Sequence, residues 1–250
     1  MAVADEPFGV EPFDAETFEA RPFFERWQSS WGAEVSSRRA ELHRLAGALR
    51  IAIDAIMDTQ AEEAAITEAA ELAEALAAVL QAQPRGRTVQ GWAEVANSGD
   101  AHGFFDFSPV LGRANPLAPP VDMNVYEDEV RGTVAWGAAY EGPPGCVHGG
   151  HIAAAFDEVL GMTQSITGTP GMTGYLTIRY RSPTPLHTEL AFRAWVERVD
   201  GRKILTKGTL HHGEVLCAEA EGLFITVDFA KFEAMRAQVN DDTRSSTSSP

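Results

Sequence analysis

The chain is most informative at residues 142–151, which read Gly-Pro-Pro-Gly-Cys-Val-His-Gly-Gly-His and are followed by Asp157 and Thr173. The two glycines Gly149 and Gly150 stand where residues with helical spacing begin. A helix that starts there leaves its first N–H groups without intrahelical acceptors. Aimed at a carbonyl oxygen, such N–H groups stabilise developing negative charge, and the helix dipole assists them. The stretch therefore predicts a central helix with chemistry at its start.

Residues 150–163 predict a helix with two different faces. The apolar face, expected to pack on a sheet, comprises Ile152, Phe156, Val159, Leu160 and Thr163. The other face carries small residues around one carboxylate, namely Gly150, Ala153, Ala154, Asp157 and Gly161. A lone Asp on a helix is more often solvated surface, but small neighbours permit close approach by another helix or a substrate. This setting favours a functional role for Asp157.

The spacing of the helix-start glycines and the carboxylate bears on assembly. Asp157 lies eight residues beyond Gly149, which is roughly 12 Å along a helix axis. One carbonyl group cannot touch both on the same helix. If the two groups cooperate, an antiparallel copy of the helix must bring its Asp157 to this Gly149, as a two-fold dimer does. The spacing thus predicts a homodimer with two equivalent sites, and a tetramer stays open as a further assembly.

The sequence around this helix predicts an antiparallel sheet. Runs rich in β-branched and aromatic residues lie at 123–126, 130–136, 175–180, 189–199, 204–211 and 215–227. Asp-Gly at 200–201 and His-Gly at 212–213 separate successive runs and favour tight turns, so the last four runs predict a sequential meander. One helix against such a sheet gives the α+β class.

The rest of the chain predicts extensions to this domain, which is expected over residues 87–230. Residues 1–33 alternate Pro, Phe and acids and predict an extended arm. Residues 34–86 carry apolar residues at helical spacing on both sides of a break and predict a helical hairpin. The polar tail at 231–250 is expected to be mostly disordered.

Composition excludes several classes of protein. The net charge is -16, and residues 1–82 alone contain 16 acidic and 6 basic residues, so a nucleic-acid binder is not expected. The two cysteines show no metal or disulfide spacing. No apolar run is long enough to span a membrane, and the acidic beginning of the chain does not resemble a signal peptide. These features predict a soluble cytoplasmic protein.

One segment departs from the acidic balance. Residues 173–207 hold seven basic residues against three acidic ones, and these are Arg179, Arg181, Arg193, Arg198, Arg202, Lys203 and Lys207. A local basic cluster in an acidic chain suits a compact anion such as a nucleotide phosphate.

The ordered set of motifs resembles the hotdog-fold acyl-CoA thioesterases, in particular the phenylacetate-pathway and carboxyl-terminal-modulator-protein-like branches. The set comprises Val-His-Gly-Gly at 147–150, Asp157 nine residues after the His, and Met-Thr at 172–173. Residues 171–180 (Gly-Met-Thr-Gly-Tyr-Leu-Thr-Ile-Arg-Tyr), Pro-Thr-Pro-Leu at 183–186 and Val-Asp-Gly-Arg-Lys at 199–203 also fit. The similarity covers about residues 120–228. It implies a hotdog fold and a hydrolase of lipid metabolism.

The resemblance also implies roles for single residues. Asp157 would be the general base or nucleophile, Gly149 and Gly150 would polarise the thioester carbonyl, and Thr173 would position water or the carboxylate. His148 would orient the loop. Some relatives carry an amide side chain six residues before the His, where this chain has Gly142, so fewer donors or a backbone group would hold the carbonyl.

The residues that would hold the substrate follow from the same resemblance, whereas the expectation about metal follows from the positions of the histidines. The CoA phosphates would be held by Arg179, Arg181, Arg202 and Lys207. No cofactor is expected, because coenzyme A is part of the substrate. No metal is expected either, because His148 and His151 lie too close to the glycine turn to form an obvious ligand set with Asp157.

Two other functions stay open at the level of sequence. The first is a hotdog dehydratase or hydratase acting on acyl thioesters, although such enzymes usually show a longer spacing between the His and the acid. The second is a non-catalytic acyl-CoA-binding protein that docks through its amino-terminal arm and helices.

Overall fold

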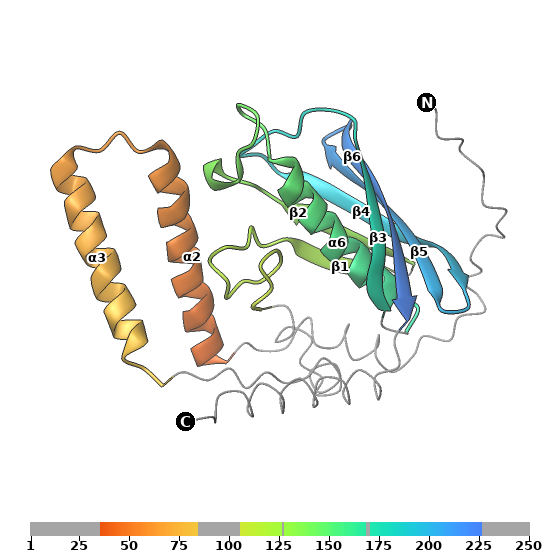
Figure 1. Cartoon of the computed structure of the whole chain (residues 1–250), viewed down its shortest axis with the longest axis horizontal. Helices are drawn as coiled ribbons and strands as arrows, with labels where there is room; N and C mark the ends of the chain where they lie inside the picture. The colour runs from red at the N-terminus through yellow and green to blue at the C-terminus, as the bar shows by residue number, and fades with distance from the viewer. Residues whose placement is uncertain (1–35, 85–105, 127, 169–170, 227–250) are drawn as a thin grey trace, which may run out of the picture.

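The structure, a computed structural model, describes residues 36–84, 106–126, 128–168 and 171–226. The helices are α2 (Ser37–Asp58), α3 (Glu63–Gln81) and α6 (Gly149–Ser165), with a 3-10 turn η2 (Ala138–Tyr140). The strands are β1 (Asp122–Tyr126), β2 (Glu129–Val134), β3 (Gly171–Tyr180), β4 (Leu190–Asp200), β5 (Lys203–His212) and β6 (Val215–Thr226). Figure 1 shows α6 lying across the sheet and the α2–α3 pair beside it. The predicted α+β class, with a long central helix on an antiparallel sheet, is confirmed.

The strand order corrects the predicted meander. The six-stranded sheet runs β1-β2-β4-β5-β6-β3. Strands β4, β5 and β6 follow one another through turns at Gly201 and Gly213, both with positive φ, as predicted. Strand β3 instead pairs with β6 at one edge. Because β3 is an edge strand and β4 lies inside the sheet, the nine residues 181–189 between them cross the sheet instead of closing a hairpin.

Helix α6 packs on the sheet through the face predicted from its spacing. Phe156 is fully buried and meets Phe192 of β4 edge to face, with ring centroids 5.1 Å apart. Leu160 sits over Gly208 and Gly222, where an added Cβ would lie 3.2 Å from a Leu160 methyl group in each case. Two glycines on adjacent strands thus let the middle of the helix approach the sheet closely. This contact sets the distance between α6 and the sheet at a point one turn beyond Asp157.

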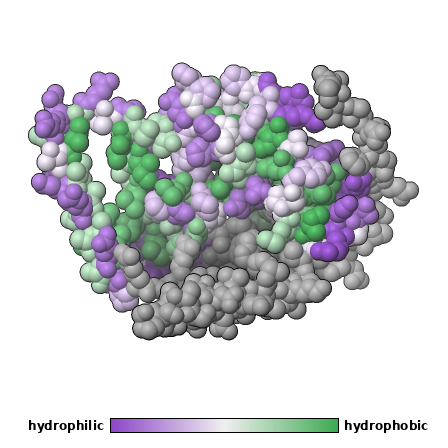
Figure 2. All heavy atoms as spheres, viewed as in Figure 1, coloured by the Kyte–Doolittle hydropathy of each residue, from purple (hydrophilic) through white to green (hydrophobic). Residues whose placement is uncertain are grey.

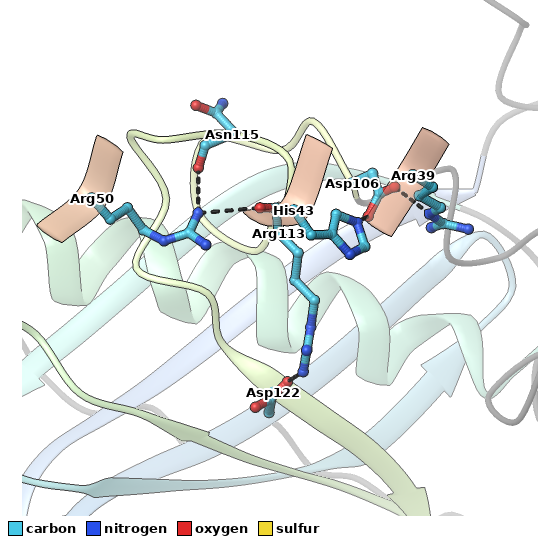
Figure 3. Close-up of polar contacts among 7 residues, drawn as sticks. All are labelled: Arg39, His43, Arg50, Asp106, Arg113, Asn115 and Asp122. Atoms are coloured by element: carbon cyan, nitrogen blue, oxygen red, sulfur yellow. Dashed lines mark hydrogen bonds and ion pairs between the residues drawn. The ribbon is translucent and has the colours of Figure 1, made fainter. Parts of the chain in front are cut away.

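Helix α2 is attached to this domain by polar contacts (Figure 3). Asp106 is buried and accepts from His43 Nε2 at 2.8 Å, and it also pairs with Arg39. Arg50 donates to the backbone oxygens of Asn115 and Arg113 at 2.9 and 3.2 Å. Since these partners lie in the segment before β1, the contacts join the amino-terminal hairpin to the sheet domain.

Helix α3 contributes nothing to the described core. None of its residues is buried, and Ile66, Leu72 and Val79 are each more than half exposed. Figure 2 shows apolar surface on both helices of the hairpin. The hairpin lies within the predicted residues 34–86, but the apolar stripe of its second helix is not covered by any described residue.

Two predicted segments, the arm at 1–33 and the tail at 231–250, lie outside the described residues. Among the helices that the structure describes, none combines the length and the apolar character that a membrane span requires.

Candidate active site

The start of α6 is held by the side chain of His148, which occupies the N-cap position. His148 Nδ1 accepts from the Gly150 N–H at 3.0 Å. The His148 backbone N–H donates to Tyr140 O at 2.8 Å, and the Tyr140 ring meets His151 edge to face. His148 therefore links the loop at Tyr140 to the start of α6. Burial, and the neighbouring His148, lower the pKa of His151, which favours its neutral form.

Gly149 is the one helix-start glycine whose N–H stays free among the described residues. Its carbonyl oxygen accepts from the Tyr180 hydroxyl at 2.8 Å. Of the two N–H groups predicted to polarise a carbonyl, that of Gly150 is occupied by His148. The Gly149 N–H is thus the donor that a substrate oxygen can reach without displacing another acceptor.

Asp157 and Thr173 meet as the resemblance implies. The Thr173 hydroxyl donates to Asp157 Oδ1 at 2.8 Å. This contact crosses from the edge strand β3 to α6 and leaves the second carboxylate oxygen available to another group. Asp157 itself is half-buried. The other residues predicted for the small-residue face of the helix, which are Gly150, Ala153, Ala154 and Gly161, are half-buried or exposed.

A β-bulge in β3 makes the contact between Asp157 and Thr173 possible. The pairing of β3 with β6 shifts register between Thr173 and Tyr175. Thr173 lies opposite Phe224, a buried residue on the helix side of the sheet, whereas Tyr175 lies opposite Leu223 on the other side. Beyond the bulge, Tyr180 returns to the helix side, opposite buried Ala218. One extra residue therefore aims both hydroxyl groups at α6.

The helix-start donor and the carboxylate do not meet within one chain. Gly149 and Asp157 lie on one uninterrupted helix, about 12 Å apart along its axis. The geometry expected from the sequence is present, and it requires a second chain if both groups act on one carbonyl.

The four predicted phosphate-binding residues lie apart from the Asp157 side of the sheet. Strand pairing places Arg179 and Lys207 opposite Glu219 and Glu221, on the outer face that points away from α6. Arg181 pairs with Glu219 as well. Lys207 Nζ donates to Glu197 at 2.9 Å.

Arg202 is the fourth of these residues and stands at the turn between β4 and β5. Its guanidinium donates to the backbone oxygen of Thr226 at 2.9 Å. Arg179 and Arg181 thus share Glu219 as an ion-pair partner, whereas Lys207 and Arg202 have partners elsewhere, so the four do not form one cluster.

A half-buried carboxylate next to Asp157, that of Glu158, was not singled out from the sequence. Glu158 Oε1 accepts from the Ser108 hydroxyl at 2.8 Å, in the segment that also carries Asp106. Burial, together with the charge of Asp157, raises the pKa of Glu158 against the opposing effect of the Ser108 hydrogen bond. A helical Glu in a sequence gives no sign of burial, because the covering segment is distant in the chain.

We expect Glu158→Gln to stabilise the protein at neutral and basic pH. The amide keeps an oxygen for Ser108 and removes a charge that burial disfavours. The Tm should rise by about 2–4 °C, as about 1 kcal/mol produces in a chain of this size. Since the folded pKa lies above the unfolded one, the carboxyl gains a proton as pH falls through the folded value, and the advantage of Gln should fade there. Thermal melts across pH 4–8 test this, and an advantage that grows toward acid would contradict it.

Tyr180 was not singled out from the sequence either. Period-2 alternation puts Tyr180 on the face opposite Thr173, so only the bulge reveals its contact with Gly149. A glycine after a strand threonine, Gly174, is the available signal. As for metal ions, the described residues include no group of three or more His, Cys, Asp or Glu arranged to hold one.

Fold and site together define a class of protein. A helix that begins with two glycines lies on an antiparallel sheet, and its carboxylate accepts from a hydroxyl on the edge strand. This is the hotdog arrangement that the sequence resembles.

Comparison with known proteins gives the family. The model of the thioesterase superfamily matches residues 144–219. A thioesterase superfamily protein of known crystal structure is 33% identical, with a TM-score of 0.62 over 74% of this chain and 94% of that one. The chain belongs to the thioesterase superfamily, and the predicted hotdog fold is confirmed.

Relatives of named activity match over a shorter length. Acyl-coenzyme A thioesterase THEM4 of Xenopus laevis is 37% identical over 91 residues, which are 36% of this chain and 41% of that protein. THEM4 of Mus musculus is 35% identical over 94 residues, or 37% of this chain and 40% of that protein. The chain thus matches about two fifths of the length of these relatives.

Proposed function

We propose that this protein hydrolyses acyl-CoA thioesters to the free acid and CoA. The observation that carries the proposal is the Asp157 carboxylate, held by the Thr173 hydroxyl at 2.8 Å. It lies on a helix whose first N–H, that of Gly149, has no partner among the described residues. The thioesterase superfamily membership and the name of the THEM4 relatives support the proposal. The names of those relatives suggest acyl-CoA as the substrate, whereas the Asp157 carboxylate and the Gly149 N–H donor are groups of this chain.

The reaction needs little beyond these groups. A water molecule gives a proton to Asp157 and its oxygen attacks the thioester carbonyl. The negative charge that forms on the carbonyl oxygen is stabilised by the Gly149 N–H and the positive end of the helix. When the intermediate collapses, the C–S bond breaks and the thiolate of CoA takes up the proton. Thiolate is a good leaving group, so no metal or cofactor is called for.

A second route through the same residue stays open. Asp157 could attack the carbonyl itself, release CoA and form an anhydride that water then hydrolyses. In both routes Thr173 holds one carboxylate oxygen and leaves the other free to react. Single-turnover hydrolysis in heavy-oxygen water separates the two routes where water opens the anhydride at the Asp157 carbonyl. The label then enters Asp157 and the product acid stays unlabelled, whereas general base catalysis puts the label in the product acid.

The proposed active unit is a two-fold homodimer. Gly149 of one chain and Asp157 of the other would meet at one carbonyl group, because within a chain they are about 12 Å apart. The small-residue face of α6 supports a close approach, since Ala153, Ala154 and Gly161 lie there only partly covered. A dimer of this kind has two equivalent sites, and two dimers could associate further.

The basic residues are proposed to hold CoA at a distance from the carbonyl. Arg179, Arg181 and Lys207 share the outer face of the sheet, and Arg202 lies at a turn beyond it. A CoA phosphate would have to replace Glu219 or Glu197 as their partner. We also propose a cytoplasmic location, consistent with the two free thiols Cys146 and Cys217.

A thiol-release assay tests the function. Short-, medium- and long-chain acyl-CoA and aryl-CoA esters are incubated with the protein, and free CoA is followed with a thiol reagent. We expect release with at least one ester class. Hydration of an enoyl-CoA without thiol release would favour a dehydratase or hydratase. Tight CoA binding without turnover of any ester would favour a non-catalytic binding protein.

A further inference from the structure

Tyr180 stands at the end of β3 with its side chain over the start of α6. Its hydroxyl donates to Gly149 O at 2.8 Å. The ring is close as well, because a Cβ on Gly149 would lie 3.2 Å from Tyr180 Cζ and from its hydroxyl oxygen. Tyr180 thus contacts Gly149 from a strand that lies outside the loop leading into α6.

The hydrogen bonds of the two peptide units around Gly149 leave one donor. The Gly149 carbonyl and the Gly150 N–H belong to one planar unit, whose oxygen accepts from Tyr180 and whose N–H donates to His148 Nδ1 at 3.0 Å. In the preceding unit, His148 O accepts from the N–H groups of His151 and Ile152 at 2.9 and 3.4 Å. Both planes are therefore held at their polar atoms, and the Gly149 N–H is left to bind a substrate.

Two consecutive glycines do not by themselves hold the Gly149 N–H in one direction, because glycine has the widest choice of backbone angles. An oxyanion donor is useful only if its direction is fixed before the charge develops. Nothing in the side chains of Gly149 and Gly150 supplies that constraint, so it must come from neighbours. The peptide plane that carries the Gly149 N–H is held at His148 O, and the following plane is held by His148 Nδ1 and the Tyr180 hydroxyl. Together these contacts restrain the two dihedral angles of Gly149 between the planes.

We propose that Tyr180 is a positioning residue for catalysis: its hydrogen bond to the Gly149 carbonyl restrains the backbone of Gly149, and with it the Gly149 N–H. The inference rests on the proposed thioesterase function. It assigns Tyr180 no contact with the substrate and no proton transfer. Its effect belongs to the transition state, when the carbonyl oxygen gains charge, and not to the binding of CoA.

A purely structural tyrosine would behave differently from a positioning one. The Tyr180 side chain is exposed, with a relative accessibility of 54%, so removing its hydroxyl should leave the stability nearly unchanged. Tyr175 offers a matched control on the same strand. Its hydroxyl donates to Glu221 at 3.2 Å on the opposite face of the sheet, and the residue is 41% exposed.

The test compares Tyr180→Phe with Tyr175→Phe. For Tyr180→Phe we expect kcat to fall about 10-fold, because a less firmly held Gly149 N–H would lose about 1.4 kcal/mol of transition-state stabilisation, with KM and Tm unchanged. For Tyr175→Phe we expect wild-type kcat, KM and Tm. A kcat for Tyr180→Phe equal to that of the control would overturn the inference. A fall in Tm with no fall in kcat would overturn it too.

A second measurement reads the contact directly. In amide NMR spectra, the Gly150 N–H signal should shift in Tyr180→Phe and stay in place in Tyr175→Phe, because the Gly149 carbonyl and the Gly150 N–H share one peptide unit. Unmoved Gly150 signals in Tyr180→Phe would overturn the proposed contact. Turnover by the wild type with an unaffected Tyr180→Phe rejects this inference alone, whereas absence of turnover in the wild type rejects the proposed function and this inference with it.

Discussion

Asp157→Asn should remove nearly all thioester hydrolysis while leaving the protein folded. Asn keeps an oxygen that can accept from the Thr173 hydroxyl, as Asp157 Oδ1 does at 2.8 Å, so the local geometry survives. What is lost is the group that takes a proton from water or attacks the carbonyl. General base catalysis contributes roughly 10²–10⁴-fold, and we expect kcat/KM to fall by about that much. Steady-state thiol release with the best ester of the panel measures it.

The control for this variant is the adjacent carboxylate. Glu158→Gln neutralises an acid on the same helix, one residue further on. Its carboxylate accepts a hydrogen bond from the Ser108 hydroxyl and has no part in the proposed reaction. The variant should keep turnover within a small factor of the wild type. If Asp157→Asn keeps substantial activity, or if both variants lose it equally, Asp157 is not the reacting group.

Two inactive variants should restore activity when mixed. In the proposed dimer each site takes Asp157 from one chain and Gly149 from the other. A mixed dimer of an Asp157→Asn chain with a Gly149→Pro chain then has one doubly defective site and one intact site. Random exchange of equal amounts makes half of the dimers mixed, so activity should reach about one quarter of the wild type. The measurement is thiol release before and after subunit exchange in mild denaturant.

Gly149→Pro is chosen because it removes the N–H with little harm to the helix. Gly149 is the first residue of α6, where proline is well tolerated. His148 before it has φ -62 and ψ 130, an extended conformation that a following proline favours. Gly149→Ala is its matched control, since it adds a Cβ near Tyr180 but keeps the N–H.

The control mixture pairs Asp157→Asn with Thr173→Val. Thr173 contacts Asp157 of its own chain, so both defects fall on the same half of a site and no mixed dimer regains an intact one. Activity in this mixture should not exceed the mean of its parents. If the Gly149→Pro mixture also stays at that level after verified exchange, the two groups do not meet across chains.

The sequence predicted the helices and strands of this fold better than it predicted which strands pair with one another. The apolar face of α6 was evident from spacing, because its residues recur at the helical period and all of them are buried. The position of β3 beside β6 was not, since pairing depends on where residues 181–189 carry the chain and not on the strand residues themselves. Local patterns specify a strand, and connections specify its partners.

The site was predictable to the extent that its groups are close in sequence. Gly149, Asp157 and Thr173 follow one another along a helix and the next strand, so their spacing carried the geometry. Tyr180 and Glu158 owe their contacts to a bulge and to a covering segment some fifty residues upstream. Neither the bulge nor the covering segment changes the periodic pattern of the sequence around Tyr180 and Glu158.

The bulge at Gly174 gives β3 a constraint on length as well as on residue type. Thr173 and Tyr180 are seven positions apart, an odd separation that would send their side chains to opposite sides of a regular strand. Both reach α6 only because one position between them is left out of the alternation. Many substitutions along this strand are compatible with that arrangement, but a single deletion is not. Deleting Gly174 would turn one of the two hydroxyl groups away from the helix, so the carboxylate and the glycine donor depend on one unpaired residue in common.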